Sequence, residues 1–173
     1  GVRRNLPFTY TLMLIGTLAL TGFPFLSGFY SKDAIIEFAY LNGSTVGYYA
    51  AGVGILTAVL TSIYSWRLFF KTFHGNYNNK EVKSHEIHDS PLVMLIPLII
   101  LSTGAIFAGI AFKDLFIGYS ETINFWGKSI FFLEPLSKEH PPFWFLILTP
   151  TLVTISIPIS YYLFVKNTDL PHA

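Results

Sequence analysis

A lysine stands inside an otherwise apolar stretch of the chain, at position 32. The stretch, residues 7–41, is apolar enough to lie in a bilayer, and Lys32 follows a run rich in glycine and proline. A charged side chain at membrane depth costs about 2.5–3.5 kcal/mol on insertion scales, so such residues mark ion or proton pathways. The pattern therefore predicts a proton path at Lys32. The alternative is a lysine near a helix end that extends to the membrane interface.

Two acidic residues follow the lysine and lie one helical turn apart. Asp33 and Glu37 share a helix face, since residues four apart are neighbours on a helix surface. They are candidates for gate partners of Lys32 or for relays on the exit side. The alternative is that both carboxylates are solvated at the mouth of the span.

A polar stripe on the second apolar stretch is a further candidate. Thr57, Thr61 and Ser65 recur every four residues, and Arg67 follows them toward the end of the stretch. The hydroxyls either line a hydrated path or bond to their own backbone and to neighbouring helices, which is commoner. Arg67 is either part of a proton entry funnel or a charge at the interface. His74 is expected to cap the helix, and it is also a candidate to titrate at the mouth of the path.

Hydropathy predicts about four membrane crossings, at residues 7–41, 46–73, 92–112 and 142–165, with an interfacial loop at 113–141. The first stretch would be about 52 Å long as one helix, against a core of about 30 Å. Gly22, Pro24 and Gly28 place an interruption near residues 22–28. An all-α polytopic membrane fold with a discontinuous first crossing follows, rather than a re-entrant hairpin.

Charge supports the single broken crossing. With one crossing per stretch, seven basic residues fall on the side of both termini, namely Arg3, Arg4, Arg67, Lys71, Lys80, Lys83 and Lys166. Three fall on the other side, namely Lys113, Lys128 and Lys138. By the positive-inside rule both termini then face the cytoplasm or matrix.

Composition excludes several classes of function. Only 12% of the residues are charged and 52% are hydrophobic, against about 25% charged in soluble domains. A net charge of +1 gives no case for a nucleic-acid partner, and the absence of cysteine excludes thiolate metal sites. His85 and His88 have H-x-x-H spacing, but two histidines alone are weak evidence for a metal, and none is predicted.

The segment around Lys32 resembles a family signature. Residues 26–36, LSGFYSKDAII, resemble the G-F-[FWY]-S-K-D-x-I-[IL] pattern of the antiporter-like subunit 5 of respiratory complex I, chain L in bacteria. Residues 65–75, SWRLFFKTFHG, resemble its next helix, and residues 88–91, HDSP, resemble its H-[ED]-S-P segment. Multisubunit sodium/proton antiporters share much of this pattern.

The resemblance implies a role in the proton-translocating arm of NADH:ubiquinone oxidoreductase. In that family the S-K-D lysine lies on a discontinuous helix, so Lys32 would be the outlet-side lysine and Asp33 its immediate partner. No redox cofactor is expected in this chain, and NADH, FMN, iron–sulfur clusters and ubiquinone would be bound elsewhere in the complex. The alternatives are a sodium/proton antiporter subunit and a structural fragment without a proton path.

The resemblance covers only the later helices of a complete member. The first half-channel, the central lysine and the lateral helix have no counterpart here, so we expect the rest of the subunit, in the same or a separate chain, to be a partner. Neighbouring antiporter-like subunits, other complex I subunits and lipids are the other expected partners. The mitochondrial inner membrane is the expected location, and a bacterial cytoplasmic membrane is the second choice.

Overall fold

The chain folds into a bundle of helices. The computed structural model describes residues 1–74, 88–116, 125–127, 129 and 141–166. Within these ranges there is no β-strand, and the main elements are α1 (Pro7–Thr21), α2 (Ser27–Leu41), α3 (Thr45–Phe73), α4 (Leu92–Phe116), α6 (Phe143–Tyr161) and a π-helical turn, η3 (Tyr162–Lys166). The predicted all-α fold is confirmed.

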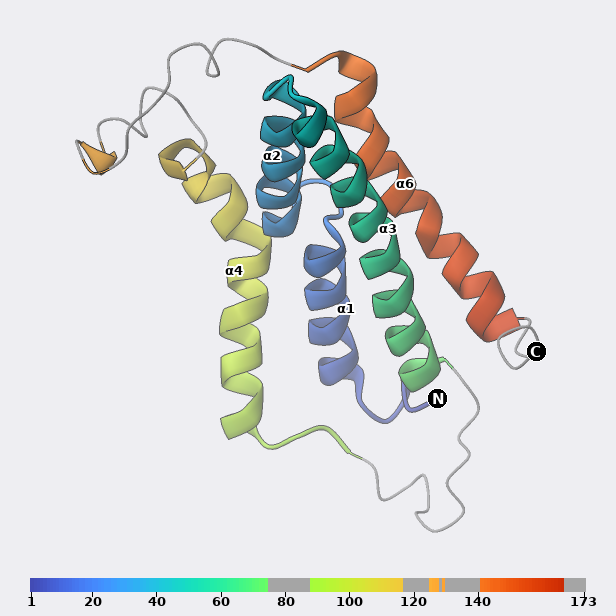
Figure 1. The fold of residues 1–173 in the computed structure, drawn as a ribbon. Helices are drawn as coiled ribbons and strands as arrows, with labels where there is room; N and C mark the ends of the chain where they lie inside the picture. Colours follow the sequence, from blue (N-terminus) through green and yellow to red (C-terminus); the bar gives the residue numbers. More distant parts are fainter. Residues whose placement is uncertain (75–87, 117–124, 128, 130–140, 167–173) are drawn as a thin grey trace.

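Three elements are long and apolar enough to cross a membrane, namely α3, α4 and the continuous stretch of α6 and η3. The shorter apolar helix α1 is followed end to end by α2, so the two together form the interrupted first crossing (Figure 1). The α4 helix continues to Phe116, beyond the predicted end of its span. Lys113 is therefore helical, in a last turn where a basic residue complements the helix dipole. Most of the predicted interfacial loop at 113–141 lies outside the described residues.

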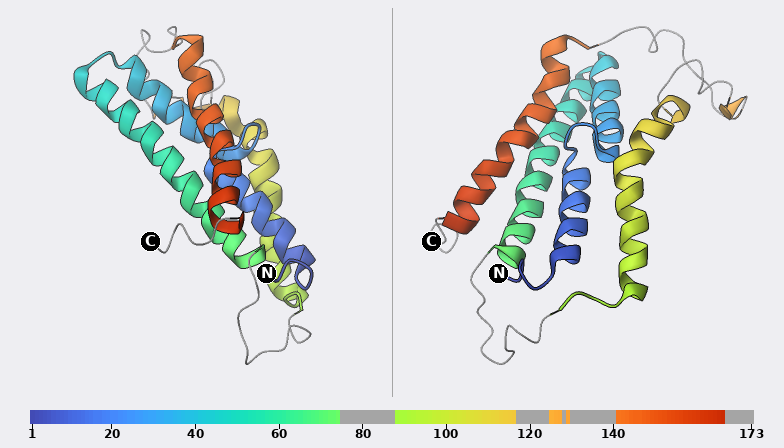
Figure 2. Two further views of the ribbon diagram at one scale, coloured as in Figure 1. Left: turned by 90° about the vertical axis from the view of Figure 1, so that its right-hand side faces the viewer. Right: turned by 180° about the vertical axis from the view of Figure 1, so that it is seen from behind.

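The interrupted crossing lies at the centre of the bundle. The α4 helix contacts both α1 and α2, α3 also contacts both, and α6 packs on α3 (Figures 1 and 2). The starts of α1 and α4 and the ends of α3 and η3 lie at one end of the bundle (Figure 1). We call this the basic end, because the segments there carry Arg3, Arg4, Arg67, Lys71 and Lys166.

The long helix α3 supplies the core on which both halves of the first crossing pack. Its aromatic cluster near the basic end consists of Trp66, Phe69, Phe70 and Phe73. Tyr10 of α1 packs on this cluster, with its ring centroid 5.2 Å from that of Phe69. Toward the opposite end, Ile36 of α2 packs with Ala51 of α3 and Phe145 of α6. The position of α1 is thus fixed against α3 mainly at the basic end.

The contact between α2 and α4 depends on a glycine. A Cβ atom added to Gly109 of α4 would lie only 2.5 Å from the Cα atom of Ser27, at the start of α2. Gly104 on the same helix faces open space, with no heavy atom within 4 Å of such a Cβ among the described residues. Close backbone approach at small residues is a common way for membrane helices to pack.

We predict that Gly109→Ala lowers the thermal stability of the purified protein in detergent, because the added methyl group overpacks the contact with Ser27, a change that typically costs about 1–3 kcal/mol. Gly104→Ala is the matched control. It should leave stability unchanged or raise it slightly, since alanine is favoured over glycine in a helix by up to about 1 kcal/mol. Equal unfolding midpoints for the two variants would contradict the close contact.

Candidate functional site

The first half of the crossing ends in a glycine cap. Gly22 has φ of 82°, a left-handed conformation that glycine adopts without steric cost. Its N–H donates to the Ala19 carbonyl at 3.2 Å, and the N–H of Phe23 donates to the Leu18 carbonyl at 3.0 Å. This pair of bonds is a Schellman motif, which satisfies two of the carbonyls that a helix end leaves free. Gly22 therefore ends α1 at the position where the sequence predicts the break to begin.

Lys32 supplies a hydrogen-bond donor that the backbone lacks. In a continuous helix the Leu20 carbonyl would accept from the N–H of residue 24, but Pro24 has no N–H. The Lys32 Nζ donates to this carbonyl at 3.2 Å. The ammonium also lies at the C-terminal end of α1, where the helix dipole is negative. Pro24 therefore removes the usual donor to the Leu20 carbonyl oxygen, and Lys32 replaces it.

The non-helical segment is short and strained. It covers residues 22–26, and Phe25 within it has φ of 71°, a region that bulky residues rarely occupy. Gly28 was predicted to belong to the break, but it lies inside the first turn of α2. A Cβ atom there would lie within 2 Å of the Ala19 carbonyl oxygen, so Gly28 permits close approach to α1 rather than a turn.

Lys32 and its sequence neighbour Asp33 face different cavities. Lys32 lines a cavity of about 430 Å³ between α2 and α3, which Thr57 also lines. Asp33 and Glu37 together line another of about 300 Å³, and their shared helix face is confirmed. Lys113 and Asp114 of α4 line this second cavity as well. The structure thus gives the two acidic residues α4 neighbours that sequence reasoning missed.

Arg67 and His74 lie far from Lys32. Arg67 is exposed near the basic end, with its guanidinium carbon 5.6 Å from the ring centroid of Phe164. His74 caps α3 with its backbone N–H, as predicted, and its ring lies 5.8 Å from that of Tyr10 at the start of α1. Lys32 is bonded to Leu20 near the other end of α1, ten residues beyond Tyr10 and about 15 Å away along the helix. The structure does not bring these residues together.

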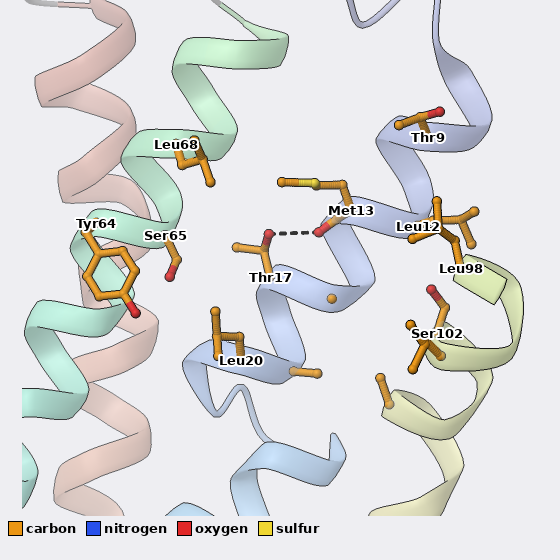
Figure 3. Close-up of a pocket in the computed structure, with 14 residues that line it drawn as sticks. Thr9, Leu12, Met13, Thr17, Leu20, Tyr64, Ser65, Leu68, Leu98 and Ser102 are labelled. Carbon is orange, nitrogen blue, oxygen red and sulfur yellow. Dashed lines mark hydrogen bonds between the residues drawn. The ribbon is translucent and has the colours of Figure 1, made fainter. Parts of the chain in front are cut away.

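A third cavity, of about 450 Å³, runs beside α1 between α3 and α4 (Figure 3). Its lining is mostly apolar and includes Leu20, whose carbonyl accepts the hydrogen bond from Lys32.

The polar stripe of α3 is bonded mainly within its own helix. The hydroxyls of Thr57 and Thr61 donate to backbone carbonyls of α3, which is the commoner of the two arrangements expected from the sequence. The buried Ser65 hydroxyl lines the third cavity and has no partner among the described residues.

Metal ligation has no support within the described residues, where no group of three histidine or acidic side chains could hold an ion. Of the histidine pair, His85 lies outside the described residues. His88 is exposed, and its Nδ1 lies 3.1 Å from the backbone carbonyl oxygen of Asp89.

The ring of His74 gives the basic end a pH dependence. Burial and the nearby Arg3 guanidinium lower the pKa of His74 from its ordinary value of about 6.5. A lowered pKa means that the folded protein favours the neutral ring. The contribution of the neutral His74 ring to the stability of the folded protein is complete above pH 6.5, and it is lost as the pH falls through the lowered pKa.

We therefore predict that thermal stability in detergent falls on acidification below about pH 6.5, and that His74→Phe flattens this dependence while keeping the ring contacts. Unfolding midpoints measured from pH 5 to pH 8 provide the test. His88→Phe, at an exposed histidine, is the control and should retain the dependence of the wild-type protein. An unchanged profile in His74→Phe would assign the acid sensitivity to another group.

Residues 1–61 match the family described as NADH:quinone oxidoreductase/Mrp antiporter, transmembrane region. These residues contain α1, the break, α2 and the first part of α3, and therefore Lys32 with its carbonyl acceptor.

Similarity to individual proteins extends over most of the chain. The sequence is 43% identical over 164 residues to NADH-ubiquinone oxidoreductase chain 5 of Marchantia polymorpha, and 41% identical over 169 residues to that of Phytophthora infestans. The alignments cover 93% and 95% of this chain but only 23% and 25% of these relatives, so the chain spans about a quarter of their length. The chain of Arabidopsis thaliana is 44% identical, again over 93% of this chain. The chain thus belongs to the family of antiporter-like membrane subunits of NADH:quinone oxidoreductase, as a counterpart of part of chain 5.

Proposed function

We propose that the chain is part of the proton-translocating membrane arm of respiratory complex I, and that Lys32 is the outlet-side lysine of its proton path. The observation that carries this proposal is the hydrogen bond from the Lys32 Nζ to the Leu20 carbonyl, at a helix break within an apolar crossing. An ionisable group in such a position costs free energy of insertion, and such groups are expected where ions or protons pass.

The carbonyl gives the lysine a position that depends on its charge. An ammonium is held by the hydrogen bond and by the negative end of α1, whereas a neutral amine keeps only a weaker bond. On losing its proton, the side chain is free to leave Leu20 for the cavity that it lines between α2 and α3. Transfer then consists of breaking one N–H bond, with water as acceptor, and of later reprotonation from the part of the path that this chain does not contain.

Asp33 and Glu37 are suited to the release side. They line a cavity on the α4 side of α2, with Lys113 at the end of α4 that lies away from the basic end. A proton that reaches this cavity has carboxylates to bind before it enters bulk water. In this scheme Asp33 and Glu37 are the release relay, and Arg67 and His74 belong to the opposite face of the membrane.

The rest of the machinery is assigned to partners. These are the remaining part of the subunit, the neighbouring antiporter-like subunit, other complex I subunits and lipids. NADH, FMN, iron–sulfur clusters and ubiquinone are bound in other subunits, and this chain carries no redox chemistry. By the positive-inside rule the basic end faces the matrix of a mitochondrion, or the cytoplasm in a bacterial membrane.

A second function has one observation in its favour, because the description of the matched family also names Mrp antiporters. A subunit of a multisubunit sodium/proton antiporter would use the same lysine in exchange rather than in redox-driven pumping. Purification from native membranes separates the two, since a complex I subunit copurifies with NADH-oxidising activity and an antiporter subunit does not.

We predict that Lys32→Ala lowers the number of protons pumped per electron in the assembled complex by at least about half, while NADH:quinone reduction continues. The reason is that the proposed path loses the amine that is bonded at the break. Proton uptake by vesicles and NADH oxidation are measured on the same preparation. Lys71→Ala, at the exposed end of α3, is the control.

Wild-type pumping by the Lys32→Ala variant would contradict the role proposed for Lys32. It would favour the alternative that the chain is a structural part of the membrane arm without a proton path. Wild-type pumping by Lys71→Ala is required before the Lys32 result is interpreted.

A further inference from the structure

The N-terminus of α1 is capped from a distant part of the chain. Leu6, at the N-cap position, makes no side-chain cap, and Pro7 follows it at the first helical position. The next two backbone donors, Phe8 N–H and Thr9 N–H, have no carbonyl partner within the helix. Both donate to the carboxylate of Asp89, at 3.2 Å and 3.1 Å, and the Thr9 hydroxyl donates to it at 2.8 Å.

This cap joins α1 to the segment that leads into α4. Asp89 lies 80 residues beyond Thr9 and three residues before the start of α4, and Figure 1 shows that segment passing below the start of α1. The first intrahelical bond, from Tyr10 N–H to the Leu6 carbonyl at 2.9 Å, begins where the Asp89 bonds end. Every N–H in the first turn of α1 is thus satisfied, and two of these groups depend on one side chain.

The two ends of α1 therefore carry charges that α1 itself lacks. Its sequence from Pro7 to Thr21 contains no aspartate, glutamate, lysine, arginine or histidine, while Asp89 caps the positive end of its dipole and Lys32 the negative end. Although partial burial opposes it, the hydrogen bonds from Thr9 and Phe8 lower the pKa of Asp89. The carboxylate is therefore ionised at every pH above its ordinary range, and the cap is present under working conditions.

We propose that Asp89 is a positioning residue for Lys32, because it anchors one end of α1 and thereby fixes the Leu20 carbonyl at the other end. Helix α1 is a rigid rod of about four turns, so a tilt or slide of its first turn moves the carbonyl that the lysine binds. The aromatic contact of Tyr10 with α3 restrains one side of the same turn, and Asp89 restrains the side toward α4. The inference rests on the function proposed for Lys32.

The test uses the assembled complex and three variants. Asp89→Ala removes all three bonds. Asp89→Asn keeps an oxygen that can accept from the Thr9 N–H and hydroxyl but replaces the oxygen that accepts from Phe8 with an amide NH₂. Thr11→Val is the nearby control, because among the described residues the Thr11 hydroxyl bonds only to the Pro7 carbonyl of its own helix.

Hydrogen exchange reports on the cap without relying on activity. In Asp89→Ala, we expect exchange of the Phe8 and Thr9 amides to be faster by about five-fold or more, the factor that matches a typical cap of about 1 kcal/mol. In Asp89→Asn, only the Phe8 amide should exchange faster. Wild-type exchange at both amides in Asp89→Ala would overturn the cap itself.

Proton pumping reports on the coupling to Lys32. Asp89→Ala should pump about two-fold fewer protons per electron at unchanged assembly and NADH oxidation, and Asp89→Asn should restore most of the loss, because asparagine caps helices as well as aspartate does. A loss that Asp89→Asn does not rescue, or a loss shared by Thr11→Val, would overturn the proposal. Should Asp89→Ala fail to assemble, Thr9→Val takes its place, because it removes the hydroxyl bond to Asp89 and leaves the carboxylate intact. Faster exchange of the Thr9 amide together with wild-type pumping in that variant would overturn the proposal.

Failure of this inference is separable from failure of the proposed function. If Lys32→Ala abolishes pumping and Asp89→Ala leaves it intact, the lysine keeps its role and Asp89 loses its own. If Lys32→Ala leaves pumping intact, the positioning role falls together with the role of the lysine.

Discussion

One carbonyl group governs the architecture of this chain. A backbone oxygen that has lost its donor to a proline is costly in an apolar environment, and in a membrane it must be satisfied by protein or by water in a cavity. The Leu20 oxygen meets this requirement through the Lys32 Nζ. The position of α2 relative to α1, the close approach of Gly28 to Ala19 and the seating of Ser27 against Gly109 are all compatible with this single bond. A helix break that would otherwise destabilise the crossing is thereby made part of the fold.

The same bond relates stability to function. If Lys32 only capped the helix, a neutral hydrogen-bond donor could replace it. If Lys32 also gains and loses a proton, the strength of its hydrogen bond to the carbonyl changes with its charge. Lys32 lines a cavity between α2 and α3, and its neighbour Asp33 lines a second cavity toward α4. In the proposed path, the charge of Lys32 would therefore set the strength of the bond that holds the break together.

Local chemistry was readable from the sequence, and distant contacts were not. Gly22 and Pro24 located the break because their effects on φ and on backbone donors act within a few residues. The helix extents followed from hydropathy, except that α4 continues through Lys113, a charged residue that a helix end accommodates. Gly28 was misplaced because glycine serves turns and close packing equally well. The partners of Lys32, Asp33 and Thr9 come from other helices or from 80 residues away, so only the packed structure could identify them.

The interruption between α1 and α2 has an electrical consequence. Both helices run in the same direction (Figure 1), so their peptide dipoles are aligned, and the five residues between them separate a negative helix end from a positive helix start. An unbroken helix would have neither of these partial charges at this depth. The interruption therefore creates a local electric field in a region of low dielectric constant, and that field distinguishes a cation on the α1 side from one on the α2 side. Any movement that straightened the segment would remove the field, and would change the free energy of the protonated amine without any new charged group approaching it.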